Sequence, residues 1–248
     1  MKRALPLLGI GALAYLLVLV VTFPAARLTP LLERQVAGLS LHAITGSVFS
    51  GQAGQLVYQG IDFGELTWQF RPAALLLGRM AYHLELPGSA NPGHADIAFT
   101  PWGHVYGQDI ELLLSPDLLV KHYSPVPVKT SGELHLQIDT FRMASDFPED
   151  LAGTISWEDG VILEPVEIIL GDVSMVLSGQ GEALSGRLVE GGRLEAAGEM
   201  QLFADGRYNV NLRILPDNEM SDETLATLEM LGQMQSDSSL LFTASGQL

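Results

Sequence analysis

The sequence contains no cysteine and little positive charge. Its 248 residues include 13 Lys and Arg against 29 Asp and Glu, so the formal net charge is −16 at pH 7. The absence of cysteine excludes disulfides, thiolate catalysis and zinc sites built on cysteine. The scarcity of basic residues argues against direct nucleic-acid binding, because such binding depends on Lys and Arg displacing the counterions of the phosphate backbone.

The motifs of common enzymes and cofactor sites are also absent. The sequence has no His-Glu-x-x-His, Gly-x-Ser-x-Gly, P-loop or Gly-x-Gly-x-x-Gly pattern. Acidic pairs such as Glu158/Asp159 and Asp222/Glu223 fall where turns and helix starts favour acids. The histidines do not form a metal-binding motif; they are His42, His83, His94, His104, His122 and His135. We therefore predict a protein that is not an enzyme and has no catalytic, cofactor-binding or metal-binding residues.

One long apolar run lies at the N-terminus. Ala4–Phe23 has 20 residues without a charge, and a helix of that length spans about 30 Å, the thickness of a bilayer core. Lys2 and Arg3 precede the run, which favours a cytoplasmic N-terminus and a translocated C-terminal body. A cleaved signal peptide is the alternative, but it would place Pro24 or Phe23 at the −3 position, where small residues are needed. We predict a cytoplasmic tip and an uncleaved transmembrane anchor within residues 1–26.

After this run the hydrophobic pattern predicts a short helix and then many strands. Thr29–Gly38 has a capping residue, an early proline and a terminal glycine, which predicts a juxtamembrane helix within residues 27–40. Apolar and polar residues then alternate with a period of two, as in half-buried antiparallel strands. Further short helices are predicted at Pro72–Gly78 and Ser221–Leu231. The predicted strands are Ile61–Phe70, Met80–Leu86, His104–Leu114, Glu133–Asp139, Thr154–Trp157, Asp172–Ser178, Arg193–Leu202, Arg207–Ile214 and Ser239–Ser245.

The predicted fold class is therefore mainly β, with a transmembrane helix, a β-rich body and a few short helices. Turn signals at Glu158–Gly160 and Ala204–Gly206 separate neighbouring strands. A one-sided apolar pattern fits either a sandwich or a long curved sheet whose apolar face forms a groove. A faint internal duplication, with 107 residues between Gly46 and Gly153, divides the body into two similar antiparallel halves, 41–130 and 131–248.

The tryptophans and the last strand are the candidate interaction features. Trp68 and Trp157 fall in or beside predicted strands, and core packing is the expected role of such large side chains, with recognition as the alternative for the three tryptophans including Trp102. Ser239–Ser245 is the candidate edge strand to which a partner's strand can add, although an edge protected within the fold is more common.

Several segments together resemble a known family. They are Phe23-Pro24, Ile44–Ala53 (ITGSVFSGQA), Leu66–Pro72 (LTWQFRP), Gly153–Trp157 (GTISW), Gly191–Leu194 (GGRL) and Gly246–Leu248 (GQL). In this order, and over nearly the whole chain, they resemble the N subunit of the bacterial type II secretion system. The resemblance implies an inner-membrane, non-catalytic accessory subunit with a periplasmic body, which supports export of folded proteins from the periplasm across the outer membrane. It also implies contacts with the inner-membrane platform subunits and with the subunit that connects them to the secretin, and it implies no cofactor or small-molecule ligand.

A looser similarity supports a different function. The alternating strands and the region Trp68–Gly78 are also similar to large envelope proteins of the AsmA type. That resemblance implies a curved sheet with an apolar groove that binds or transfers lipid. The two hypotheses differ in whether the apolar face stays open and in whether lipid copurifies with the protein.

Overall fold

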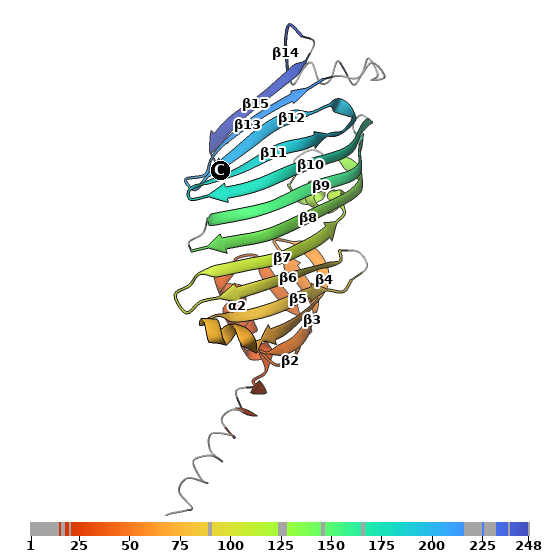
Figure 1. Ribbon diagram of the computed structural model, residues 1–248. Coiled ribbons are helices and arrows are strands. Elements are labelled where there is room, and N and C mark those ends of the chain that lie inside the picture. Colours follow the sequence, from red (N-terminus) through yellow and green to blue (C-terminus); the bar gives the residue numbers. More distant parts are fainter. Residues whose placement is uncertain are drawn as a thin grey trace, which may run out of the picture.

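A single antiparallel sheet of 15 strands makes up the body of the protein. The computed structural model describes residues 15, 18–19, 21–88, 91–123, 128–144, 147–164, 167–215, 225, 232–237 and 239–247. The strands follow one another in the order β1-β3-β4-β5-β6-β7-β8-β9-β10-β11-β12-β13-β15-β14, and β2 pairs with β3. Figure 1 shows a long sheet that curves at its N-terminal end, where β2 to β4 pass behind β5 to β7 in this view.

The elements are short and closely spaced along the chain. The strands are β1 (Leu39–His42), β2 (Thr45–Gly46), β3 (Ser50–Tyr58), β4 (Ile61–Arg71), β5 (Met80–Leu86), β6 (Gly93–Phe99), β7 (Val105–Leu114), β8 (Lys129–Met143), β9 (Pro148–Glu164), β10 (Ile168–Gln180), β11 (Ala183–Gly191), β12 (Ala197–Phe203), β13 (Arg207–Ile214), β14 (Gln233–Met234) and β15 (Leu240–Gln247). The helical elements are η1 (Ala25–Arg27), α2 (Thr29–Gln35), η2 (Pro72–Leu77), α3 (Pro116–Tyr123) and η3 (Gly192–Leu194). Tight turns make this meander possible. One is Gln59-Gly60 between β3 and β4, where both residues have positive φ as a two-residue hairpin turn requires.

The alternating hydrophobic pattern located most strands correctly. Four predicted strands match β4, β5, β7 and β13 to within one residue at each end. Three others lie inside the longer strands β8, β9 and β10, and Ser239–Ser245 overlaps β15. The predicted helix at Pro72–Gly78 is the 3-10 helix η2, which ends at Gly78 with a φ of 69°. The two faces of each strand differ in burial, and this difference explains why the alternation of apolar and polar residues predicted the strands.

Two strand boundaries were predicted wrongly. Arg193–Leu202 is not one strand, because the positive φ values of Gly192 and Glu195 turn the backbone, and β12 begins only at Ala197. Glu158–Gly160 is not a hairpin turn. It lies inside β9, where pairing with β10 shifts register but continues on both sides. A β-bulge uses the same residue types as a turn, so local composition does not separate the two.

The segment 27–40 contains the predicted short helix, α2, with one difference at its start. The predicted cap, Thr29, lies inside the helix, and Leu28 occupies the cap position without a side-chain hydrogen bond. The preceding 3-10 turn η1 supplies the reason, since the Thr29 hydroxyl donates to the Ala25 carbonyl at 3.4 Å. The chain therefore enters α2 from a preformed turn.

Two predicted helices fall outside the residues that the structure describes. Ala4–Phe23 lies mostly outside them, and of Ser221–Leu231 only Leu225 is described. Among the described residues, none of the helices has the length and apolar character needed to cross a membrane.

The sheet runs without a break through the middle of the chain. Residues 130 and 131, where the two predicted halves meet, lie within β8. This strand pairs with β7 from Val105↔Met143 to Leu114↔Leu134, and with β9 along its other edge. Of the two architectures left open by the sequence, the described residues form the single curved sheet.

Candidate functional site: an open apolar face and a free edge

Cross-strand pairing extends one apolar surface along the whole sheet. Directly paired residues point to the same face, so their partners form rows across the strands. One row is Phe70, Tyr82, Ile97, Gly107, Phe141, Leu151, Gly179, Leu184, Leu202 and Tyr208. A second row is Ile110, Ile138, Gly153, Leu177, Gly186, Met200, Val210 and Ala244. We call the surface that bears these two rows the apolar face.

Glycines in these rows let large side chains lie across neighbouring strands. A Cβ atom on Gly107 would lie 1.9 Å from Cε1 of Phe141, far inside contact distance. A Cβ atom on Gly186 would likewise lie 2.7 Å from Sδ of Met175. Glycine in a strand interior is otherwise unfavourable, and it marks a close approach of this kind. The apolar face is therefore covered by large side chains that lie over neighbouring glycines.

The apolar face is open over most of its length. In the two rows, the glycines and Ile138 are buried, whereas every other side chain is at least partly exposed. The exposed fraction of Met200 is 38 %, and none of the described elements forms a second layer over the strands around it. A contiguous exposed apolar surface is uncommon on soluble proteins and marks a binding surface.

At the N-terminal end of the apolar face lies an open cavity of about 440 Å³. The residues from η1 to α2 contribute one wall, and strands β4, β5 and β6 contribute the other. The lining side chains are Ala25, Leu28, Thr29, Leu31, Leu32, Gln35, Leu41, Ile44, Val48, Leu66, Trp68, Met80, Tyr82, Leu84, Ile97 and Phe99. None of them is charged. We call this space the α2 cavity.

Trp68 and Trp157 lie on the apolar face and not in the closed core that was predicted for them. Both are half-buried. Trp68 lines the α2 cavity and donates its indole N–H to the Ser47 carbonyl at 3.0 Å. Trp157 lines a second apolar hollow of about 240 Å³ and donates to the Ser131 carbonyl, also at 3.0 Å. With their N–H groups paired, both rings offer apolar surface to these hollows.

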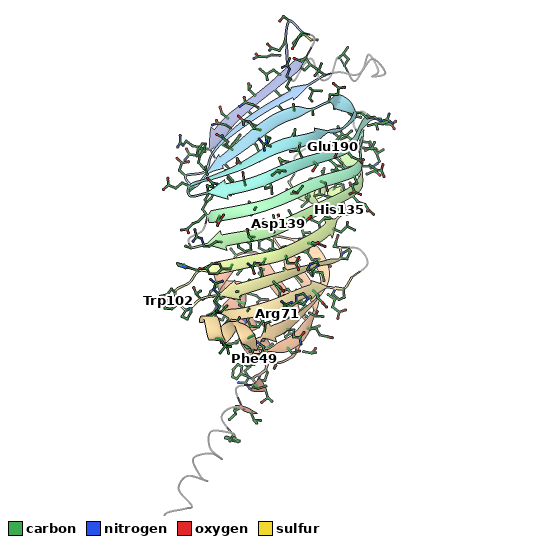
Figure 2. The ribbon with its side chains drawn as sticks, in the orientation of Figure 1. Phe49, Arg71, Trp102, His135, Asp139 and Glu190 are labelled. Carbon is green, nitrogen blue, oxygen red and sulfur yellow. The ribbon has the colours of Figure 1, made fainter. Side chains whose placement is uncertain are left out.

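Trp102 has a different environment from the other two tryptophans. It is 79 % exposed and lies in the turn between β6 and β7, outside both hollows. In Figure 2 it is labelled at the margin of the sheet.

Polar side chains form a charged cluster on the opposite face of β4, β5 and β6. His83 lies at the centre, with Nδ1 at 2.6 Å from Oδ1 of Asp96. The Arg71 guanidinium pairs with Oδ2 of the same aspartate at 2.7 Å, and Glu85 lies 3.1 Å from His83 Nε2. The hydrogen bond that His83 donates to Asp96 is the main reason that the pKa of His83 is raised above its ordinary value.

A second polar cluster, on β6 and β7, was missed in the sequence. His94, Asp109 and Glu111 bring three potential metal-ligand atoms within 4.8 Å of one another. The two acids lie fifteen or more residues from His94, and only the strand register and the irregularity near Asp109, with its φ of 51°, bring the three together. Both acid side chains are more than half exposed, and exposed acidic groups of this kind are common without a bound ion.

The acidic pair Glu158/Asp159 has local structural contacts. The Asp159 backbone N–H donates to Oδ1 of Asp172 at 2.9 Å, and Glu158 lies 3.8 Å from His135 Nε2. The other predicted pair, Asp222/Glu223, lies outside the described residues.

Within the described part of the chain, the outer edge of the last long strand is unpaired over most of its length. β15 pairs with β13 along one edge, from Leu240 to Gln247. On its other edge β14 pairs only with Leu240 and Leu241, and no described element pairs with the rest. The remaining residues, Phe242–Gln247, contain no charge and no proline, although charge and proline are the usual protection of an edge. We call this segment the free edge.

An open apolar face, two hollows without charge clusters and a free edge together define a binding or scaffold protein. The family model described as "Type II secretion system (T2SS), protein N" matches residues 37–241. The chain belongs to this family. It is 26 % identical to Type II secretion system protein N of Aeromonas hydrophila over 94 % of each chain. It is 24 % identical to Type II secretion system protein N of Vibrio cholerae over 85 % of this chain and 86 % of the relative. No solved structure matches the chain significantly.

Proposed function

We propose that the protein is a non-catalytic accessory subunit of type II secretion, anchored in the inner membrane with its sheet in the periplasm. Membership of the protein N family supports the role in secretion. The apolar run Ala4–Phe23, preceded by Lys2 and Arg3, supports the anchor and its orientation. In this position the sheet supports the export of folded proteins across the outer membrane by holding other subunits.

The free edge of β15 is the observation that supports a role in binding other subunits. Every second residue of an edge strand directs its backbone N–H and C=O groups outward, where they can pair with another strand. Phe242–Gln247 has no charged residue or proline that would oppose such pairing. An extended segment of another secretion subunit would continue the sheet by strand addition, with main-chain hydrogen bonds providing the affinity. We propose as partners the inner-membrane platform subunits and the subunit that connects them to the secretin.

Photo-cross-linking in living cells tests this proposal. A photoreactive amino acid at Thr243 or Ser245, on the free edge, should capture another subunit of the secretion machinery. The same amino acid at Gln137, which lies on the central strand β8 and is paired on both sides, is the matched control and should capture none. Cross-links of equal yield from Gln137 and the free edge would contradict strand addition at β15.

A charge variant adds a functional measurement. Lysines on an edge strand oppose the approach of another strand, so Thr243→Lys with Ser245→Lys should reduce secretion to the level of a strain lacking the gene. Thr154→Lys, on the central strand β9, adds a lysine without touching an edge and should leave secretion unchanged. Unchanged secretion in the strain lacking the gene, with no captured subunit, would refute the accessory role.

A further inference from the structure

The α2 cavity has the size and lining of a site for an apolar ligand. Its volume of about 440 Å³ falls within the range of ligand pockets, about 300–1,000 Å³. Leucines occur on both walls, with Leu28, Leu31 and Leu32 on one and Leu66 and Leu84 on the other, and the remaining side chains are mostly apolar or aromatic. No lining side chain carries a charge, and the lining offers few polar groups, so the cavity favours an apolar ligand over a charged one.

The polar atoms of the lining already have partners within the protein or lie in apolar surroundings. The Thr29 hydroxyl donates to the Ala25 carbonyl, and the Trp68 indole donates to the Ser47 carbonyl. Burial raises the pKa of the Tyr82 hydroxyl, which is the expected effect of a poorly hydrated site. The backbone groups of the strand floor are used in the sheet ladder. A hydrocarbon needs no hydrogen bonds and fits these conditions, whereas an inserted peptide strand would leave its N–H groups unpaired.

The position of the cavity in the chain identifies the source of the hydrocarbon. Ala25, only two residues after the predicted membrane segment ends at Phe23, lines the cavity. The Phe23 carbonyl accepts a hydrogen bond of 3.0 Å from the backbone N–H of Val48, another lining residue. Two residues of chain reach at most about 7 Å. A cavity tied in this way to the end of a membrane segment lies beside the lipid surface.

The rim of the cavity is apolar and exposed. Leu31 is 55 % exposed, Leu32 45 %, Met80 44 % and Phe99 45 %. Apolar side chains at a mouth next to a bilayer give a hydrocarbon chain a continuous path from the lipid to the cavity, because no polar barrier intervenes. Entry of the chain would also remove these four side chains from water.

From these observations we propose that the α2 cavity binds one acyl chain of a membrane phospholipid. The site goes beyond the proposed role in secretion, because the free edge that would bind another subunit is at the opposite end of the sheet. The headgroup stays outside the cavity at the rim, since no lining side chain carries the positive charge that would offset the burial of a phosphate. The membrane anchor is a premise taken from the sequence, and it is needed only for the source of the lipid.

Contact quenching of tryptophan fluorescence tests the proposal in the full-length chain. Vesicles of phosphatidylcholine with dibrominated acyl chains are the probe, and vesicles of the unbrominated lipid give the reference. Two variants each keep one tryptophan. The first keeps Trp68, with Trp102→Phe and Trp157→Phe, and the second keeps Trp102, with Trp68→Phe and Trp157→Phe. We expect the brominated lipid to cause a large loss of Trp68 fluorescence and little loss of Trp102 fluorescence, because Trp102 lies outside the cavity.

Rim variants in the Trp68 background separate binding in the cavity from general contact with the bilayer. Met80→Glu and Phe99→Glu place a carboxylate at the mouth, and burying an unpaired charge there should weaken lipid binding at least about tenfold and restore Trp68 fluorescence. Val189→Glu is the matched control, because Val189 is 56 % exposed but does not line the cavity. This variant should be quenched like its parent.

Two results would overturn the proposal. One is equal quenching of Trp68 and Trp102, and the other is quenching of Trp68 that both rim variants leave unchanged. If a rim variant does not fold, mass spectrometry of the wild-type chain released from membranes by mild detergent decides the question, and the absence of bound phospholipid counts against the cavity. Secretion is not a readout of these measurements, so they remain decisive even if the proposed accessory role is wrong.

Discussion

Gly107→Ala provides a quantitative test of the close packing on the apolar face. The new methyl group would lie 1.9 Å from Cε1 and 2.2 Å from Cδ1 of Phe141. Ordinary contact begins at about 3.4 Å, so the ring must move by about 1.5 Å. Because the apolar face is open above Phe141, the ring can swing away from the sheet without displacing β7. We therefore expect a loss of about 1–2 kcal/mol, in the lower part of the range for overpacking.

Urea denaturation of the full-length chain in non-ionic detergent, followed by far-UV circular dichroism, measures this loss. Gly88→Ala is the control, because no atom lies within 4 Å of its added methyl group and its φ is not positive. It should be neutral or stabilising by up to about 1 kcal/mol. The cost of Gly107→Ala should shrink in a Phe141→Leu background, which removes the ring. Equal stability of Gly107→Ala and Gly88→Ala in the Phe141 background would refute the reasoning.

Two further substitutions test contacts on the two faces of the sheet. Trp68→Phe removes the indole hydrogen bond to the Ser47 carbonyl and should lower the free energy of unfolding by about 1 kcal/mol in urea denaturation, whereas the exposed Trp102→Phe should leave it unchanged. The bond to Asp96 raises the pKa of His83 above 6.5, so its stabilisation is complete below about pH 6.5 and is lost as the pH rises through the raised value. His83→Gln should therefore flatten the fall in stability as the pH rises above about 6.5, and a fall of unchanged size would contradict this assignment.

The strands could be predicted because one face of each is exposed and the other is apolar. Arg207–Ile214 alternates strictly, and its boundaries were predicted exactly as β13 has them. Strands β3, β6 and β11 were missed. In β11, Gly186 occupies an apolar-face position and Val189 is exposed, so the alternation is broken. Periodicity reports burial of side chains, and glycine on the apolar face carries no hydrophobic signal.

The shape of the sheet and its polar clusters were beyond prediction for a different reason. Alternation is the same whether an apolar face packs on a second sheet or stays open, so the sequence left both architectures open. Core packing was expected for Trp68 and Trp157 only because it is the usual role of such large side chains. The meeting of His94 with Asp109 and Glu111 depends on the register of β6 and β7 and on the irregularity between them. The spacing of the three residues along the chain predicts neither this register nor this irregularity. Ser239–Ser245 was named as a candidate edge strand, and among the described residues the outer edge of β15 is unpaired beyond Leu241.

The sequential order of the strands has a consequence for how the sheet can form. From β3 to β13 every strand pairs with the one before it, so each pairing closes only the connection between two strands that are neighbours in the chain. Each of these strands can therefore add to the edge left by its predecessor. β15 is the exception among the described strands at this end of the sheet, because it lies between β13 and β14, which both precede it in the chain. The sheet can form stepwise up to β13, and β15 must then pair with β13 across a longer stretch of chain.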